Sequence, residues 1–177
     1  MDFFEAVEKR YSHKDAFLSD AVPVEILERI AKVGLDAPNG QNKQCVKLVI
    51  LPDRESIQPL CDVSPTIGLK TAPSAIAVFT DSSNQPDFHN FEVEDYSAAV
   101  GEMVLAVTAL GYATVWLDSP YFKKENQEAA GKVLGAPPNH TLRVVLPIGL
   151  PGESKGYRGR VPFQERVFYG KYGKPRT

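Results

Sequence analysis

The sequence predicts a mixed α/β sandwich formed by a chain of 177 residues. Three observations predict this class. Helical apolar patterns alternate with short runs rich in Val and Ile along most of the chain. Hydrophobic residues make up 43% of the sequence, which is enough for one full core. No internal repeat or low-complexity tract interrupts the pattern. We therefore expect a single domain over residues 1–177.

The first half of the chain predicts helices that alternate with two buried strands. Residues 2–9 indicate a short helix, and its buried side is expected to comprise Phe3, Phe4, Ala6 and Val7. A longer helix follows from Pro23, a residue suited to the first helical turn, until Pro38 stops it. Further along, a strand, a brief helix and a second strand are expected at 45–51, 53–61 and 74–80.

The second half contains the most apolar helix of the chain. Residues 95–111 predict this helix, with Asp95 as N-cap and Gly111 as its C-terminal stop. Because apolar residues nearly surround it, the helix belongs in the centre of the fold or in a subunit interface. The polar residues 81–94 before it predict a loop. A strand, a surface helix and a last strand are expected at 113–117, 124–135 and 142–150, followed by a mostly irregular basic segment.

Charge and cysteine content limit the function classes. The net charge of −2 argues against general nucleic-acid binding through a basic surface. Residues 150–177 carry +5, however, so the rest of the chain carries −7, and this tail is suited to an anionic ligand or an acidic neighbour. The two cysteines, Cys45 and Cys61, match no metal or disulfide pattern. With no signal-peptide or membrane-span pattern, we expect a cytoplasmic protein.

Residues 9–17, KRYSHKDAF, place Arg10, Ser12 and Lys14 at every second position. In an extended chain this spacing puts the three side chains on one face. An arginine fork, a lysine ammonium and a small hydroxyl together suit an anion with several oxygens, such as a terminal phosphate. Taken alone, the stretch also fits a solvated basic turn between two helices.

Several catalytic signatures are absent from the sequence. Neither GxGxxG nor GxxxxGK[ST] occurs, which argues against a Rossmann dinucleotide site and a P-loop. His13, His89 and His140 lie far apart without ligand-like neighbours, so we expect ordinary surface or capping histidines and no metal site. No GxSxG elbow or cysteine nucleophile pattern is present. Either the protein is not an enzyme, or a bound cofactor performs the chemistry.

Two further stretches favour a bound cofactor. Residues 37–44, APNGQNKQ, gather four amide side chains and a glycine in a tight turn after a helix. Amides supply donors and acceptors together, as the edge of a heterocycle demands, although a plain helix-stop loop fits as well. Residues 157–162, YRGRVP, set Arg158 and Arg160 on one side of an extended segment. Two cation pairs could then converge on one phosphate.

Five stretches follow one another in register: KRYSHKDAF, APNGQNKQ, the helix DYSAAVGEMVLAVTALGYATVWL, the strand VVLPIGLP and RGRVP. Together they resemble the FMN-dependent nitroreductase family over nearly the whole chain. This resemblance implies an α+β, three-layer sandwich with a mixed, mainly antiparallel sheet flanked by helices. It also implies an intertwined homodimer with FMN at the interface, where the helix 95–111 would be central.

The resemblance assigns roles to particular residues. It implies that Arg10, Ser12 and Lys14 hold the FMN phosphate and ribityl chain. The turn at 38–42 would reach the flavin held chiefly by the partner chain, and Lys70 would approach the flavin ring. The cofactor-binding residues expected on this basis are Arg10, Tyr11, Ser12, Lys14, Pro38, Asn39, Gly40, Asn42, Lys70, Tyr121, Arg158 and Arg160.

One turn departs from the family pattern. The family commonly has a Gly-containing turn whose backbone N–H donates to flavin N5, whereas residues 116–122 of this chain read WLDSPYF. Pro120 has no N–H, so the donor would be Ser119 or Tyr121. The chain also lacks a long excursion over the flavin, which leaves a minimal lid or one supplied by residues 81–94.

The resemblance therefore implies an NAD(P)H-dependent FMN oxidoreductase in which no side chain is catalytic. In this ping-pong cycle, NAD(P)H passes hydride to flavin N5 and leaves, and a nitroaromatic, quinone or similar conjugated acceptor takes its place. Tyr121, Phe122 or Phe91 would stack on the acceptor, although core packing is the preferred role for Phe122. Two alternatives stay open: a flavin-binding store or redox sensor with little turnover, and a cofactor-free module whose basic tail binds an acidic partner.

Overall fold

The computed structural model describes residues 1–83, 90–153 and 159–176. Its centre is an antiparallel sheet with the strand order β1-β2-β4-β3. The strands are β1 (Val46–Leu51), β2 (Ser74–Asp81), β3 (Ala113–Thr114) and β4 (His140–Gly149). The two middle strands, β2 and β4, are almost completely buried, as their continuous apolar sequences predict.

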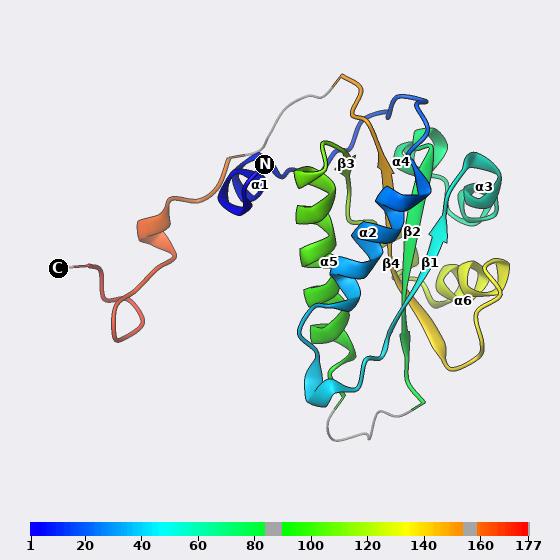
Figure 1. Cartoon of the computed structure of the whole chain (residues 1–177). Coiled ribbons are helices and arrows are strands. Elements are labelled where there is room, and N and C mark those ends of the chain that lie inside the picture. Colours follow the sequence, from blue (N-terminus) through cyan, green and yellow to red (C-terminus); the bar gives the residue numbers. More distant parts are fainter. Residues whose placement is uncertain (84–89, 154–158, 177) are drawn as a thin grey trace.

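Helices cover both faces of the sheet and give three layers (Figure 1). One face carries α2 (Val24–Leu35) and α5 (Glu92–Ala109), and α1 (Phe3–Lys9) packs on α5. The other face carries α3 (Arg54–Val63), α4 (Ile67–Thr71) and α6 (Lys124–Val133). An apolar core fills the space on each side of the sheet. The structure confirms the predicted α+β three-layer sandwich.

The start of α5 differs from the prediction. The helix begins at Glu92, three residues before Asp95, and the Asn90 side-chain oxygen accepts from the Glu92 N–H at 2.9 Å. Asp95 therefore lies inside the first turn and is no N-cap. The strand expected at 113–117 is also shorter, since only β3 and one isolated bridge, Leu117 to Val145, pair with β4.

The helix α1 is present, but the side of it that was predicted to be buried is mostly exposed in a single copy of the chain. Only Ala6 is buried, whereas Phe3 is 64% exposed, Phe4 is 76% exposed and Val7 is also exposed. The reason is that this two-turn helix packs against α5 on one side only. Its aromatic residues therefore form part of an open apolar surface.

The end of the chain leaves the sandwich. Residues 159–176 run outward past α1 as an extended arm with one 3₁₀ turn, Phe163–Glu165 (Figure 1). Nearly all of the arm is exposed, and it is mostly irregular, as predicted. None of the helices in the described part of the chain is long and apolar enough to span a bilayer.

Candidate functional site

The segment that follows α1 is extended and lies beside the edge strand β3. Ser12 forms a parallel bridge with Thr114, and the His13 N–H donates to the Thr114 carbonyl at 2.9 Å. Ser12 and Lys14 are exposed, whereas His13 between them is fully buried. Arg10 leaves α1 with extended backbone angles and is half-buried. The predicted alternation of exposed and buried side chains is present at residues 12–14. Arg10 lies two positions before Ser12, the spacing that puts side chains of an extended segment on one face.

His13 anchors this segment to the body of the protein. Its Nε2 lies 3.0 Å from the Ala16 carbonyl oxygen, which can only accept, so Nε2 carries the proton. Nδ1 then accepts from the Tyr11 hydroxyl at 3.3 Å. The ring also packs edge-on against Phe17, with the centroids 4.6 Å apart. Our expectation of a surface or capping histidine is wrong for His13, because the fold buries the ring and satisfies both nitrogens.

Lys70 lies at the same end of the sheet, exposed in the last turn of α4. The adjacent Thr71 accepts from the Phe17 N–H at 3.1 Å through its hydroxyl, which ties α4 to the N-terminal segment. The Arg54 guanidinium donates to the Ala72 carbonyl at 2.9 Å and so fixes the end of the helix. The structure therefore places Lys70 on an element that contacts the 10–17 segment.

The 3₁₀ turn Ser119–Tyr121 changes the assignment of the proposed N5 donor. The Tyr121 N–H donates to the Asp118 carbonyl at 2.8 Å, and the Tyr121 ring is 2% exposed in the core beneath α3 and α6. Burial raises the pKa of its phenol above the usual range. Because both its N–H and its ring are used inside the fold, Tyr121 is unsuited to contact a flavin or stack on an acceptor. Ser119 is therefore the remaining candidate for the backbone N–H that would donate to flavin N5.

The two phenylalanines named as stacking candidates also differ from expectation. Phe122 is 76% exposed, so core packing, its preferred role in the sequence, is wrong. Phe91 is half-buried and lies over the backbone of Gly40. A Cβ built on Gly40 would approach the ring carbons of Phe91 to 2.4 Å, so only glycine fits beneath this ring.

The amide loop, residues 39–44, has a strained backbone. Gln41, Asn42 and Gln44 have φ angles of 55°, 53° and 53°, the left-handed region that non-glycine residues rarely adopt. Within the loop, the Asn39 side-chain oxygen accepts from the Gln44 N–H at 3.0 Å. Pro38 and Asn42 are exposed and available to a ligand or a partner surface, whereas Asn39 and Gly40 are half-buried. Strain of this kind concentrates at ligand-binding segments.

Asp95, which is 2% exposed in the first turn of α5, holds the amide loop from outside. One carboxylate oxygen accepts from the Gly40 N–H at 2.6 Å, and the other accepts from the Cys45 thiol at 3.2 Å. Burial, followed by the neighbouring carboxylate, raises the pKa of Cys45 to about 12, so the thiol stays protonated and donates. Sequence reasoning assigned Asp95 a capping role, since capping and buried acids look alike in a sequence.

A separate, partly buried ion pair lies at the start of α5. Glu92 pairs with Arg143 and accepts from the Thr80 hydroxyl at 2.7 Å, while Arg143 Nε donates to the same hydroxyl at 2.8 Å. The guanidinium also lies 5.8 Å from the ring centre of Tyr96. Among the described residues, no group of three or more His, Cys, Asp or Glu side chains could hold a metal ion.

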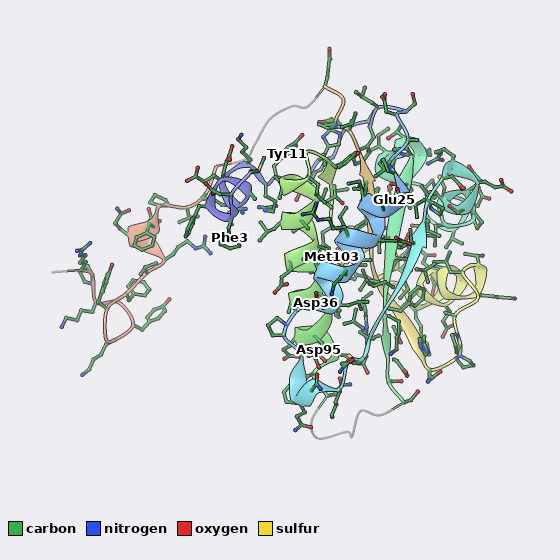
Figure 2. The ribbon with its side chains drawn as sticks, in the orientation of Figure 1. Phe3, Tyr11, Glu25, Asp36, Asp95 and Met103 are labelled. Carbon is green, nitrogen blue, oxygen red and sulfur yellow. The ribbon has the colours of Figure 1, made fainter. Side chains whose placement is uncertain are left out.

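The N-terminal segment and the amide loop lie at opposite ends of α5. Tyr11 lies near the C-terminal end of this helix, and Asp95 lies in its first turn (Figure 2). A helix of 18 residues is about 27 Å long. Within one copy of the chain, the segment of Arg10, Ser12 and Lys14 is bonded to the helix that carries Lys70, and the amide loop lies at the other end of α5.

The structure does not test the late arginines as a pair. Arg158 lies outside the described residues, and Arg160 is exposed on the extended arm. The expected convergence of two cation pairs on one phosphate stays a prediction.

An open apolar surface lies along α1, α2 and α5. A groove between these helices is lined by Phe3, Val33, Leu105, Ala109 and Leu110, among others. Neighbouring side chains of α5 are only partly buried, as its nearly continuous apolar surface predicts. Contiguous exposed apolar surface of this kind is typical of a protein interface.

Comparisons with known proteins agree with the fold. The model of the nitroreductase family matches residues 7–64 and 64–150. An Archaeoglobus fulgidus protein named "Putative NADH dehydrogenase/NAD(P)H nitroreductase" is 31% identical over 147 residues, which are 82% of this chain and 81% of that protein.

Solved structures are also similar. A nitroreductase family protein from Clostridium difficile 630 has a TM-score of 0.81 and 28% identity, and the match covers 97% of this chain and 99% of that one. An FMN-dependent nitroreductase from Clostridium difficile R20291 has the same TM-score at 20% identity, covering 96% and 99%, and shows a shared fold.

Proposed function

Because this chain belongs to the nitroreductase family, we propose that it is an FMN-dependent NAD(P)H oxidoreductase that works as an intertwined homodimer. Its acceptors would be flat conjugated molecules such as nitroaromatics or quinones. When bound, FMN supplies redox chemistry between NAD(P)H and such an acceptor in a ping-pong cycle. The chain itself supplies binding, orientation and electrostatics.

The observation that carries this proposal is the face formed by Arg10, Ser12 and Lys14. This face is anchored from behind by His13, and its donor set is two cations and a hydroxyl. Such a set fits a phosphate monoester, because the cations balance its charge and the hydroxyl donates to a further oxygen. Tyr11 lies between Arg10 and Ser12 with its hydroxyl donated to His13, and it is proposed to add a backbone or ring contact to the cofactor. Arg158 and Arg160 are proposed to contact the phosphate as well.

The amide loop supports a site shared between two copies. The exposed Asn42 of this loop and the exposed Pro38 directly before it lie about one α5 length from the phosphate-binding face of the same chain. A two-fold dimer packed through α1 and α5 would bring the loop of one protomer toward the face of the other. Asn39 and Gly40 would then contact the partner's flavin through atoms not used inside the loop, and Lys70 would contact the ring of its own chain's flavin.

Positive charge near the flavin ring favours its reduced anionic form. Lys70 would supply this charge. The Ser119 backbone N–H would donate to N5. Because Phe122 is exposed and close in sequence to this turn, it becomes the first candidate to stack on a flat acceptor.

Two measurements test the proposal. Titration of the purified chain with FMN is expected to quench flavin fluorescence at one FMN per chain, and light scattering is expected to give the mass of a dimer. Stopped-flow mixing with NADH or NADPH is expected to bleach the bound flavin rapidly, and a nitroaromatic or quinone is expected to restore its colour. A chain that binds no FMN would contradict the proposal and favour a cofactor-free module.

A flavin-binding store or sensor is the second candidate, favoured by the Pro-containing turn at Ser119–Tyr121. It predicts a yellow protein that neither NADH nor NADPH bleaches. Both cysteines are free and buried, which fits a reducing compartment, and we retain a cytoplasmic location as part of the proposal.

A further inference from the structure

We propose that Asp95 is the positioning residue of the amide loop, and that its buried carboxylate holds this strained loop in the conformation that meets the neighbouring protomer's flavin. The inference rests on the proposed function. It gives a positioning role to a residue that the sequence pattern singled out only as a helix N-cap.

The backbone of the loop requires such an anchor. Gln41, Asn42 and Gln44 all have left-handed φ angles, and in the described part of the chain no other non-glycine residue has a positive φ. Each left-handed residue is unfavourable for an L-amino acid, so this conformation persists only when surrounding contacts determine it. The hydrogen bond from the Gln44 N–H to Asn39 lies within the loop and cannot fix the loop to the body.

Asp95 holds both ends of the strained stretch. Its Oδ1 accepts from Gly40, the residue before the first left-handed position, at 2.6 Å. Its Oδ2 accepts from Cys45, the residue after the last one, at 3.2 Å. A single carboxylate thus bridges the start and the end of the loop. Hydrogen bonds to an ionised carboxylate are stronger than neutral ones, and the first turn of a helix favours the negative charge.

The position of Asp95 on α5 links the amide loop to the phosphate-binding face through one helix. The C-terminal end of α5 leads into β3, which pairs with Ser12 of the phosphate-binding face. The N-terminal end carries Asp95 and, through it, the amide loop. One rigid helix therefore sets the spacing of the two elements that a two-fold dimer would present to each pair of flavins.

Three variants test this role. Asp95→Ala removes both hydrogen bonds. Asp95→Asn keeps an acceptor for the Gly40 N–H and loses the charge, so it serves if the alanine variant does not fold. Glu92→Gln is the matched control, because Glu92 is a buried carboxylate in the same helical turn that bonds Thr80 and Arg143 and not the loop.

The readouts are FMN affinity by fluorescence titration, hydrogen exchange of residues 39–45 without FMN, and melting temperature. We expect Asp95→Ala to weaken FMN binding about tenfold or more and to speed exchange across 39–45, with a smaller change in Asp95→Asn. Glu92→Gln is expected to lower the melting temperature while the FMN dissociation constant stays within about twofold of the wild-type value.

A purely structural role for Asp95 would give a different pattern. The inference is overturned if both Asp95 variants lower the melting temperature but bind FMN as the wild type does. It is also overturned if exchange at 39–45 is unchanged without FMN. A wild-type chain that binds no FMN would instead refute the proposed function, and the exchange measurement would still report whether Asp95 holds the loop.

Discussion

Substitution of Gly40 by alanine tests how firmly the amide loop is held. A Cβ at this position would lie 2.4 Å from two Phe91 ring carbons and 2.6 Å from the Phe91 Cβ, well inside ordinary contact distance. Because the Phe91 Cβ is close to the backbone, a simple ring rotation does not relieve the clash. Overpacking of this kind costs about 1–3 kcal/mol. At roughly 2–4 °C per kcal/mol for a chain of this size, the melting temperature falls by about 2–12 °C.

Gly131→Ala is the matched control for this experiment. Gly131 lies inside α6, and its added Cβ would meet only the Ala136 Cβ at 3.9 Å, an ordinary contact. Alanine in a helix interior is favoured over glycine by about 1 kcal/mol, so this variant is expected to be more stable than the wild type.

Urea denaturation and calorimetry at one fixed protein concentration measure both effects. The same Gly→Ala change should thus have opposite signs at Gly40 and Gly131. If Gly40→Ala has the wild-type melting temperature, Phe91 does not hold the loop and the account of a fixed loop is refuted.

Three further predictions concern single residues. Lys14→Ala is expected to weaken FMN binding about tenfold, with a loss that shrinks as salt is added, whereas Lys124→Ala on α6 leaves the affinity unchanged. Thr114→Val is expected to raise stability by about 1 kcal/mol in urea denaturation, because the Thr114 hydroxyl is buried without a hydrogen-bond partner in the described part of the chain. The raised pKa of Cys45, about 12, means that the unfolded thiol loses its proton near pH 9 while the native thiol keeps it. Stability is therefore expected to fall between about pH 9 and pH 12, by up to about 1.4 kcal/mol per pH unit more than in Cys45→Ala, measured by urea denaturation across this range.

Local patterns predicted the elements well because they depend on neighbouring residues. The period of two at Arg10, Ser12 and Lys14 does correspond to an extended segment with one open face. The continuous apolar runs became the buried strands β2 and β4. These features follow from backbone geometry, which sequence periodicity reports directly.

Predictions that depend on tertiary contacts were less successful. The sequence could not distinguish an Asp95 that caps its own helix from a buried Asp95 that bonds Gly40, a residue 55 positions away in the chain. It also could not show that Tyr121 would turn its ring into the core and use its N–H in a 3₁₀ turn. The aromatic residues of α1 were predicted to be buried, yet Phe3 and Phe4 are exposed in one chain, which is the pattern of a surface that a second copy would cover.

The most direct test of the central claim, that each flavin site is built from two copies of the chain, is complementation between two defective variants. One variant carries Arg10→Ala with Lys14→Ala, and the other carries Asn39→Ala with Asn42→Ala. Each alone is expected to bind FMN weakly. In a randomly mixed dimer population, half of the dimers contain both variants, and each of these has one site with an intact face and an intact loop.

The measurement is the number of tight FMN sites after the two variants are unfolded together and refolded as a mixture. The two-copy site predicts that about a quarter of all sites recover wild-type affinity. If the mixture shows no tight sites, the phosphate-binding face and the amide loop do not meet across a dimer interface, and the account is contradicted.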